Sequence, residues 1–156
     1  MKKGFCAVVL SAALSACQST DLSTSNKSER AVTPIDLTQA DEYDAFTPYW
    51  TLVKRYDPRY PTRAALKGHS GCATLRYTIG SDGKAHSIKA IKSYPRNVFD
   101  SRAIKAMRKW RWEPTDSNLE KAPVLAEVQL DFSLEKTKNR NEAVANCGES
   151  LFHRME

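Results

Sequence analysis

The residues of this chain that could do nucleophilic or acid–base chemistry are a serine and three histidines. They are His69, Ser70, His86 and His153. A hydrolase would need a nucleophile, a base and an orienting carboxylate that converge in one pocket. These four residues are scattered, with neither the spacing of a nucleophile elbow nor that of a metal-ligand pair. We therefore expect no catalytic residue, no metal and no cofactor, unless the fold brings two of them together.

Two of the four cysteines lie near the N-terminus, in a segment with the features of a secretion signal. Residues 1–16 place Lys2 and Lys3 before an apolar run that is about half as long as a membrane-spanning helix. The run ends in "LSAC", which resembles the lipobox of bacterial lipoproteins, where a peptidase cuts before a cysteine that then receives lipid. Cys17 is the predicted lipidation site. The alternative is an ordinary signal with a chance cysteine.

The residues after Cys17 indicate where the mature protein would be held. By comparison with lipoprotein sorting, Gln18 favours the outer membrane. Residues 17–38 are rich in Ser and Thr and have no apolar period, which predicts a flexible tether. A lipoprotein modification adds more than one acyl chain, enough for stable anchoring. We expect a lipid-anchored protein on the periplasmic side of the outer membrane.

The other two cysteines, Cys72 and Cys147, would be the only thiols left after processing. The periplasm favours disulfides, so we predict a bond between them that ties residues 136–156 back to the domain. The loop-entropy model gives such a bond about 4 kcal/mol of stabilisation. Two unrelated free thiols are the alternative. A metal site has less support, because two distant cysteines without CxxC spacing make a weak ligand set.

The length and composition suit one small domain. The chain has 156 residues, of which 41% are hydrophobic, and a formal net charge of +6. A single domain commonly has ~100 to 150 residues. We place it at residues 39–135, between the tether and the tail.

The first elements of this domain are a short helix and a β-hairpin. Pro61 at a first-turn position and Gly68 after the last turn predict a helix over 61–67. Residues 72–79 alternate between apolar and polar side chains, as a half-buried strand does. A turn at Asp82 and Gly83 returns the chain as a second strand, so the pair predicts a hairpin.

A second helix follows, with a core arc and a basic arc. Asn97 and Asp100 have the spacing of a capping box, and Pro114 prevents continuation of the helix. The core arc carries Phe99, Ala103, Ala106, Met107 and Trp110, and the opposite arc carries Arg102, Lys105, Arg108 and Lys109. The basic arc could be a nucleic-acid or anionic-lipid surface. Secretion argues against nucleic acid, which leaves anionic lipid, lipopolysaccharide or a scaffolding role in the envelope as alternatives.

The clearest strand spans residues 124–134. Apolar Val124, Ala126, Val128, Leu130 and Phe132 alternate there with Glu127, Gln129, Asp131 and Ser133. This period-2 pattern predicts a strand with one buried face and one exposed face.

The order helix, hairpin, helix, strand resembles the C-terminal domain of TonB-family proteins. Supporting it are "PRYP" at 58–61, "SDGK" in the turn and "FDSRAIKAMRKWRWEP" on the second helix, over about residues 58–134. The resemblance implies an α+β fold with a three-stranded antiparallel sheet and two helices packed on one face. It also implies a binding function, since the last strand of the family's domain accepts a transporter segment as an added strand.

Strand addition uses backbone hydrogen bonds for affinity and alternating side chains for selectivity. The residues matching that partner-binding strand are Val124, Ala126, Glu127, Val128, Gln129, Leu130, Asp131, Phe132 and Ser133. The expected partner is an extended segment of an outer-membrane transporter or another envelope protein, and a homodimer stays open. Alternatively, the strand pairs with the chain itself, through residues 36–46 or the tail after Lys136.

The chain departs from the pattern of a TonB transducer in two respects. It shows neither a transmembrane helix through which a motor could act nor a long proline-rich span across the periplasm. The resemblance therefore supports a TonB-like binding module with a link to TonB-dependent transport more directly than a working energy transducer.

Overall fold

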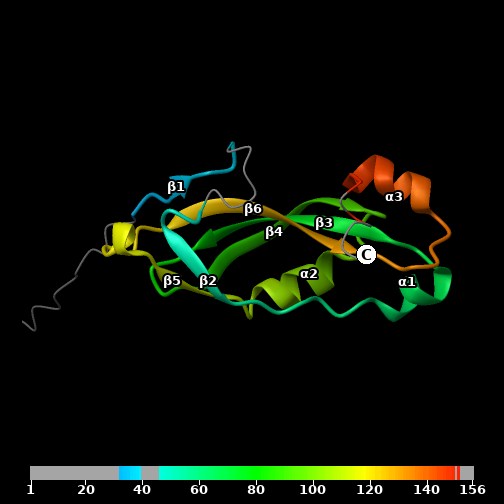
Figure 1. Ribbon diagram of the computed structural model, residues 1–156, viewed down its shortest axis with the longest axis horizontal. Coiled ribbons are helices and arrows are strands. Elements are labelled where there is room, and N and C mark those ends of the chain that lie inside the picture. The colour runs from blue at the N-terminus through cyan, green and yellow to red at the C-terminus, as the bar shows by residue number, and fades with distance from the viewer. Residues whose placement is uncertain (1–31, 40–45, 150, 152–156) are drawn as a thin grey trace, which may run out of the picture. The chain divides into compact units, whose positions relative to one another are not determined.

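The computed structural model describes residues 32–39, 46–149 and 151 (Figure 1). All of them belong to one compact unit, residues 31–156. This unit is wider at both ends than the domain predicted at 39–135. At the N-terminal end, Ile35 and Leu37 pack against the core. At the C-terminal end, Ala143, Cys147 and Leu151 pack around Cys72.

The main sheet has the order β1-β6-β3-β4. Its strands are β1 (Ile35–Asp36), β6 (Val124–Phe132), β3 (Gly71–Ile79) and β4 (Ala85–Tyr94). β3 pairs antiparallel with both β4 and β6, which gives the predicted three-stranded antiparallel sheet. The α+β fold class is therefore confirmed. β1 adds a short fourth strand, parallel to the start of β6.

One face of this sheet carries the hydrophobic core. In β3, Leu75 and Tyr77 pair with Val128 and Ala126 of β6, and all four side chains are buried. The same alternation continues along β6 and along β3 from Ala73 onward, as the period-2 pattern predicts. Since burial of apolar area is the main stabilising term, this face fixes the register of β6 against β3.

Two helices contribute to this core. α1 (Thr62–Lys67) ends at Gly68, whose φ of 67° is the left-handed conformation typical of a helix C-terminus. α2 (Asp100–Met107) buries Ala103, Ala106 and Met107 of the core arc predicted for it, whereas Trp110 is buried but lies beyond the end of the helix. The predicted cap is wrong, because Phe99 occupies the N-cap position. Asn97 instead has a φ of 61° and donates its backbone N–H to Ser93 Oγ.

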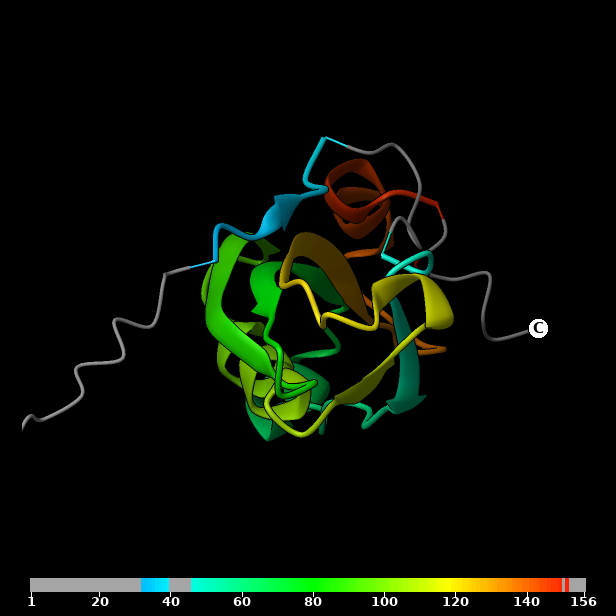
Figure 2. The same ribbon diagram turned by 90° about the vertical axis from the view of Figure 1, so that its left-hand side faces the viewer.

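β2 (Trp50–Lys54) and β5 (Arg111–Pro114) form a two-stranded antiparallel sheet that the sequence analysis does not predict (Figure 2). The Trp50 indole N–H donates to the Ala122 carbonyl at 3.0 Å, just before β6. The Trp112 backbone N–H donates to Gly83 in the hairpin turn at 3.0 Å. A 3-10 turn, η1 (Asp116–Asn118), then leads the chain towards β6. Both hydrogen bonds attach the small sheet to the same end of the main sheet, where β6 starts and the hairpin of β3 and β4 turns.

The third helix, α3 (Arg140–Cys147), lies on the other side of the sheet from α2 (Figure 1). Cys72 alternates with the core-facing Ala73, so its side chain points to that other side, where it meets Cys147. The prediction of two helices on one face therefore describes α1 and α2 but omits α3, which covers the other face. α3 went unpredicted because its residues show no apolar periodicity.

Candidate functional site

The residues predicted to bind a partner divide between the two faces of β6. Val124, Ala126, Val128, Leu130 and Phe132 point into the core and are at most 5% exposed. Glu127, Gln129 and Asp131 occupy the alternate positions and are partly exposed. Ser133 lies one residue beyond the end of β6, so its assignment to the strand is wrong.

The outer edge of β6, which faces away from β3, is occupied only at its start by a described strand. Ile35 N–H donates to the Pro123 carbonyl at 2.8 Å, and Leu37 N–H donates to the Leu125 carbonyl at 2.9 Å. Along a strand, alternate residues direct their backbone groups to the same edge. The N–H and C=O groups of Glu127 and Gln129 therefore point outward, where no strand among the described residues pairs with them.

The predicted alternative, self-pairing through residues 36–46, is realised in part. Asp36 pairs with Leu125, and the neighbouring Ile35 pairs with Val124. Residues 40–45 lie outside the described part of the chain. The observed pairing is parallel and covers two residues of a nine-residue strand.

The polar face of β6 is held by side-chain contacts. Arg76 of β3 donates to Glu127 Oε1 through Nη2 at 2.7 Å and through Nε at 2.8 Å. The Gln129 amide nitrogen donates to Asp131 Oδ1 at 2.9 Å and to the Cys147 carbonyl, at the end of α3, at 2.8 Å. These contacts fix the side chains that flank the outer edge.

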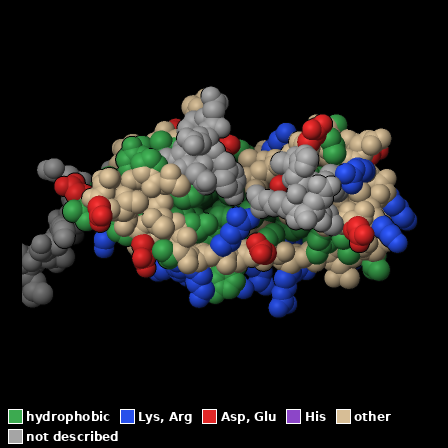
Figure 3. All heavy atoms as spheres, in the orientation of Figure 1, with side chains coloured by type: hydrophobic (Ala, Val, Ile, Leu, Met, Phe, Trp, Pro, Cys, Tyr) green, Lys and Arg blue, Asp and Glu red, His purple; other side chains and the backbone are tan. Residues whose placement is uncertain are grey.

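The core side of β6 borders an aromatic groove of about 330 Å³ that opens between β6 and β2. Its walls are mostly aromatic and aliphatic, and Arg55 lines it as well; the lining residues include Phe46, Trp50, Leu52, Tyr77, Trp110 and Val128. In the space-filling view, hydrophobic side chains floor a hollow on this face (Figure 3). An added strand would direct alternate side chains to this side of the sheet.

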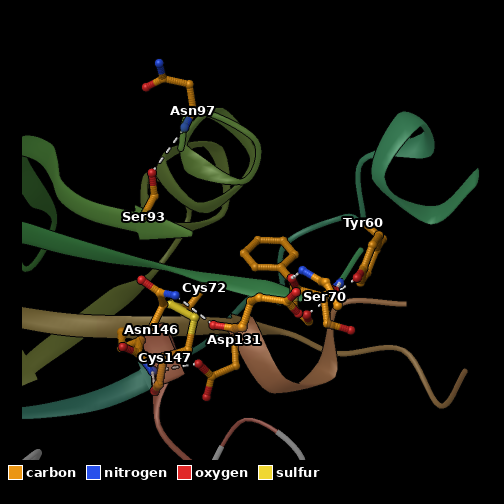
Figure 4. Close-up of a disulfide and its surroundings, with 12 residues drawn as sticks. Tyr60, Ser70, Cys72, Ser93, Asn97, Asp131, Asn146 and Cys147 are labelled. Carbon is orange, nitrogen blue, oxygen red and sulfur yellow. Dashed lines mark hydrogen bonds between the residues drawn. A yellow bond between two sulfur atoms is a disulfide. The ribbon is translucent and has the colours of Figure 1, made fainter. Parts of the chain in front are cut away.

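The disulfide holds α3 against the sheet near the end of β6 (Figure 4). Cys72 is joined to Cys147 across 75 residues of sequence, with the two Cα atoms 5.8 Å apart. Cys72 pairs with Asp131 in the register of β3 and β6. The disulfide, α3 and the polar face of β6 therefore form one connected region.

Among the described candidate catalytic residues, Ser70 and His86 are not brought together, and His69 lines a surface pocket beside α1. Ser70 is fully buried, and its hydroxyl accepts the N–H of Leu134 at 2.9 Å, which is a structural role. His86 pairs with Thr78 near the far end of β3, so a strand length of roughly 25 Å separates it from Ser70. His153 lies outside the described residues. Within the described ranges, no three His, Cys, Asp or Glu side chains are placed to hold a metal ion.

Two pKa shifts have structural causes. Burial raises the pKa of Tyr60, whose hydroxyl donates to the His69 carbonyl at 2.7 Å. Burial also acts to raise the pKa of Asp82, but hydrogen bonds from His86 and Lys84 outweigh it, so that pKa is lowered. Tyr60 thus ties the segment before α1 to the residues that follow it, and Asp82 lies in the hairpin turn between β3 and β4.

Several residues of the site were missed by the sequence analysis. Ile35 and Leu37 flank β6, but a two-residue strand is too short for a period to show. Phe46 and Trp50 line the groove, and their only sequence signal is the aromatic content of residues 43–50. Cys17 lies outside the described residues. No helix in the described part of the chain is long and apolar enough to cross a bilayer.

The helices and hairpin around a mainly antiparallel sheet define a small α+β domain in which the outer edge of β6 is paired only at its start among the described residues. Residues 56–134, half of the chain, match the family described as Gram-negative bacterial TonB protein C-terminal. The chain belongs to this family.

Relatives support the assignment over the same region. The chain is 35% identical over 81 residues to Protein TonB of Pseudomonas aeruginosa, covering 52% of this chain and 24% of that protein. It is 36% identical over 61 residues to Protein TonB of Klebsiella aerogenes, covering 39% of this chain and 25% of that protein. The chain thus spans about a quarter of the length of these relatives.

A solved structure supports the fold. The solution NMR structure of the Pseudomonas aeruginosa TonB CTD superposes with a TM-score of 0.50 at 28% identity. The superposition covers 66% of this chain and 96% of that one.

Proposed function

We propose that this protein is an envelope binding module that takes up an extended segment of an outer-membrane transporter, or of another envelope protein, along β6. The observation that carries the proposal is the outer edge of β6. Its backbone groups at Glu127 and Gln129 point outward with no described strand beside them. Unpaired strand edges are templates for an added strand.

β1 supports this mode of binding, because it already pairs with the outer edge of β6 over two residues, as an added strand would over a longer stretch. Ile35 and Leu37 turn towards the core while Asp36 between them is exposed. A bound segment that continues along this edge would likewise alternate between side chains that face the core and side chains that face solvent. The aromatic groove beside Val128 would receive its apolar side chains, and Glu127 and Gln129 would meet its polar ones.

The position of Ser70, the candidate nucleophile, favours binding over catalysis. Ser70 is buried in a structural hydrogen-bond network. Membership of the TonB C-terminal family supports a link to TonB-dependent transport. The chain spans about a quarter of the length of its TonB relatives. The proposal therefore concerns binding alone and does not include energy transduction by this chain.

Site-specific photocrosslinking in native envelopes tests the proposal. A photoreactive residue at Gln129, on the outer edge of β6, should capture a discrete envelope protein through an extended segment. The matched control carries the same residue at Lys92, an exposed position on β4 at the other side of the sheet. Equal capture from both positions, or capture of a second copy alone, would overturn the proposal; the latter outcome would indicate a homodimer.

The anchor is a separate proposal. We propose that Cys17 is lipidated and holds the domain on the periplasmic side of the outer membrane, on the basis of "LSAC" and Gln18. The Cys17→Ala chain should lose its acyl modification and leave the outer-membrane fraction. Maturation and fractionation like the wild type would rule this anchor out.

A further inference from the structure

The surface around α2 carries six basic side chains drawn from three parts of the chain. We call this set the basic face: Arg59, Arg63, Lys67, Arg102, Lys105 and Lys109. They line two adjoining pockets of about 500 Å³ each, and Arg102 lines both. Among the described residues that line these pockets, the one acidic side chain is Asp57, which already pairs with Arg55 at 3.5 Å.

The fold leaves these charges without ion-pair partners among the described residues. α2 turns Ala103 and Met107 into the core, which directs Lys105 away from it. None of the six basic side chains is in an ion pair with another residue that the structure describes. Lys109 instead lies over the Tyr56 ring, 5.4 Å from its centroid. Lys and Arg side chains gather along the margin where Figure 1 places α2 (Figure 3).

An exposed apolar side chain stands next to these charges. Leu66 of α1 is 81% exposed, and its neighbour Lys67 belongs to the basic face. Ala64 is the buried side chain of the same helix, and a separation of two residues puts Leu66 on the opposite side, pointing outward. An apolar side chain among cations is typical of surfaces that sit on anionic membranes.

We propose that the basic face binds the phosphate-bearing head groups of an anionic membrane surface, with Leu66 inserted among them. The cations would neutralise head-group phosphates, and the two pockets offer concave sites for them. An acidic protein would satisfy the charges but would leave Leu66 unexplained. Glu127 and Gln129 are not part of the basic face, so the proposal depends neither on strand addition nor on a lipid at Cys17.

Vesicle co-sedimentation tests this directly. The protein would be residues 31–156, which form a compact unit; a TonB CTD that aligns with 66% of this chain has been solved in solution. We expect binding to phosphatidylglycerol vesicles, little binding to phosphatidylcholine vesicles, and a steep loss between about 0.05 M and about 0.5 M salt. Equal binding to both lipids, or binding that salt does not weaken, would overturn the proposal.

Matched variants locate the surface. Combined Arg102→Gln, Lys105→Gln and Lys109→Gln should weaken binding on the order of 100-fold, at roughly fivefold per charge. The control combines Lys89→Gln, Lys92→Gln and Lys136→Gln, which remove the same charge at exposed positions outside the basic face. An equal loss in the control would show that net charge alone is responsible and would refute the assignment.

Leu66 separates a membrane from an acidic protein. Leu66→Ser should weaken vesicle binding at least about threefold, because it removes an apolar side chain from the interface. Polyglutamate serves as a probe for an acidic protein, and we expect it to bind the basic face more weakly than the vesicles do. Leu66→Ser should leave this binding of polyglutamate unchanged. If Leu66→Ser has no effect on vesicles and polyglutamate binds as tightly as they do, the basic face recognises an acidic protein and the membrane proposal fails.

Discussion

Trp110 is the residue at which the core and the basic surface of α2 meet. Its indole is 2% exposed and donates to the Tyr56 carbonyl at 2.9 Å, and Arg55 lies over its ring at 5.1 Å. It also contacts Trp112, with ring centroids 5.9 Å apart. The tryptophan is therefore part of the fold, although basic residues surround it in the sequence.

Truncating this side chain should be costly. We expect Trp110→Ala to lower the free energy of unfolding by about 3 to 5 kcal/mol, because it leaves a cavity and an unsatisfied Tyr56 carbonyl. Arg108→Gln, at an exposed position two residues away, should change it by less than about 0.5 kcal/mol. Denaturant unfolding of both variants measures the difference. An unchanged midpoint for Trp110→Ala would contradict its place in the core.

The hairpin turn should give part of the stability a pH dependence. The pKa of Asp82 is lowered in the folded state, since hydrogen bonds from His86 and Lys84 outweigh the effect of burial. A carboxyl whose pKa is lower when folded stabilises the protein above its unfolded pKa of about 3.9 and loses that contribution in more acidic solution. Asp82→Asn should thus be less stable than the wild type at pH ~6, with a difference that shrinks below pH ~4. A difference that stays constant in urea unfolding across this range would rule out the effect.

At the scale of elements, α3 depends on the disulfide more than on its own sequence. Its buried residues are Ala143 and Cys147, and Leu151 follows in the same small cluster. Replacing Cys72 and Cys147 together by serine should reduce the free energy of unfolding by about 2 to 5 kcal/mol. Amide exchange should speed up first in α3, while the pairing of β3 with β6 persists. Asn146→Ala, an exposed change in the same helix, is the control, and equal thermal midpoints for all three proteins would contradict this account.

β1 should compete with a partner for the start of β6. Leu37→Pro removes the N–H that donates to the Leu125 carbonyl and should release β1 from the edge. Capture of a partner from Gln129 should then rise by up to roughly tenfold, because less of the edge is self-occupied. Val32→Ala, at a 64% exposed position, should leave the yield unchanged. A lower yield from Leu37→Pro would mean that β1 assists the partner.

The parts of the fold that could be predicted have a long periodic signal. β6 alternates in burial over nine residues and β3 does so from Ala73 to Ile79, and α2 has a core arc that ends at Met107. These elements were enough to suggest the family. The predicted pairing partner of Cys72 is also the one in the structure.

The parts that could not be predicted are short or depend on distant contacts. β1 has two residues and β5 has four, too few for a period to be recognised. α3 is mostly polar and packs through a disulfide. The groove beside Val128 forms only because β2 folds against β6 from a distant part of the sequence. Such contacts follow from tertiary structure and leave no local pattern.

For the molecule as a whole, the central claim is that β6 accepts an extended segment at its outer edge. The most direct test is amide hydrogen exchange of residues 31–156, alone and with the segment captured at Gln129 supplied as a synthetic peptide. Strand addition predicts slower exchange at the outward amides of Glu127 and Gln129, with Ala126 and Val128, which already face β3, little changed. Protection confined to α2 or α3, with Glu127 and Gln129 unaffected, would contradict the account.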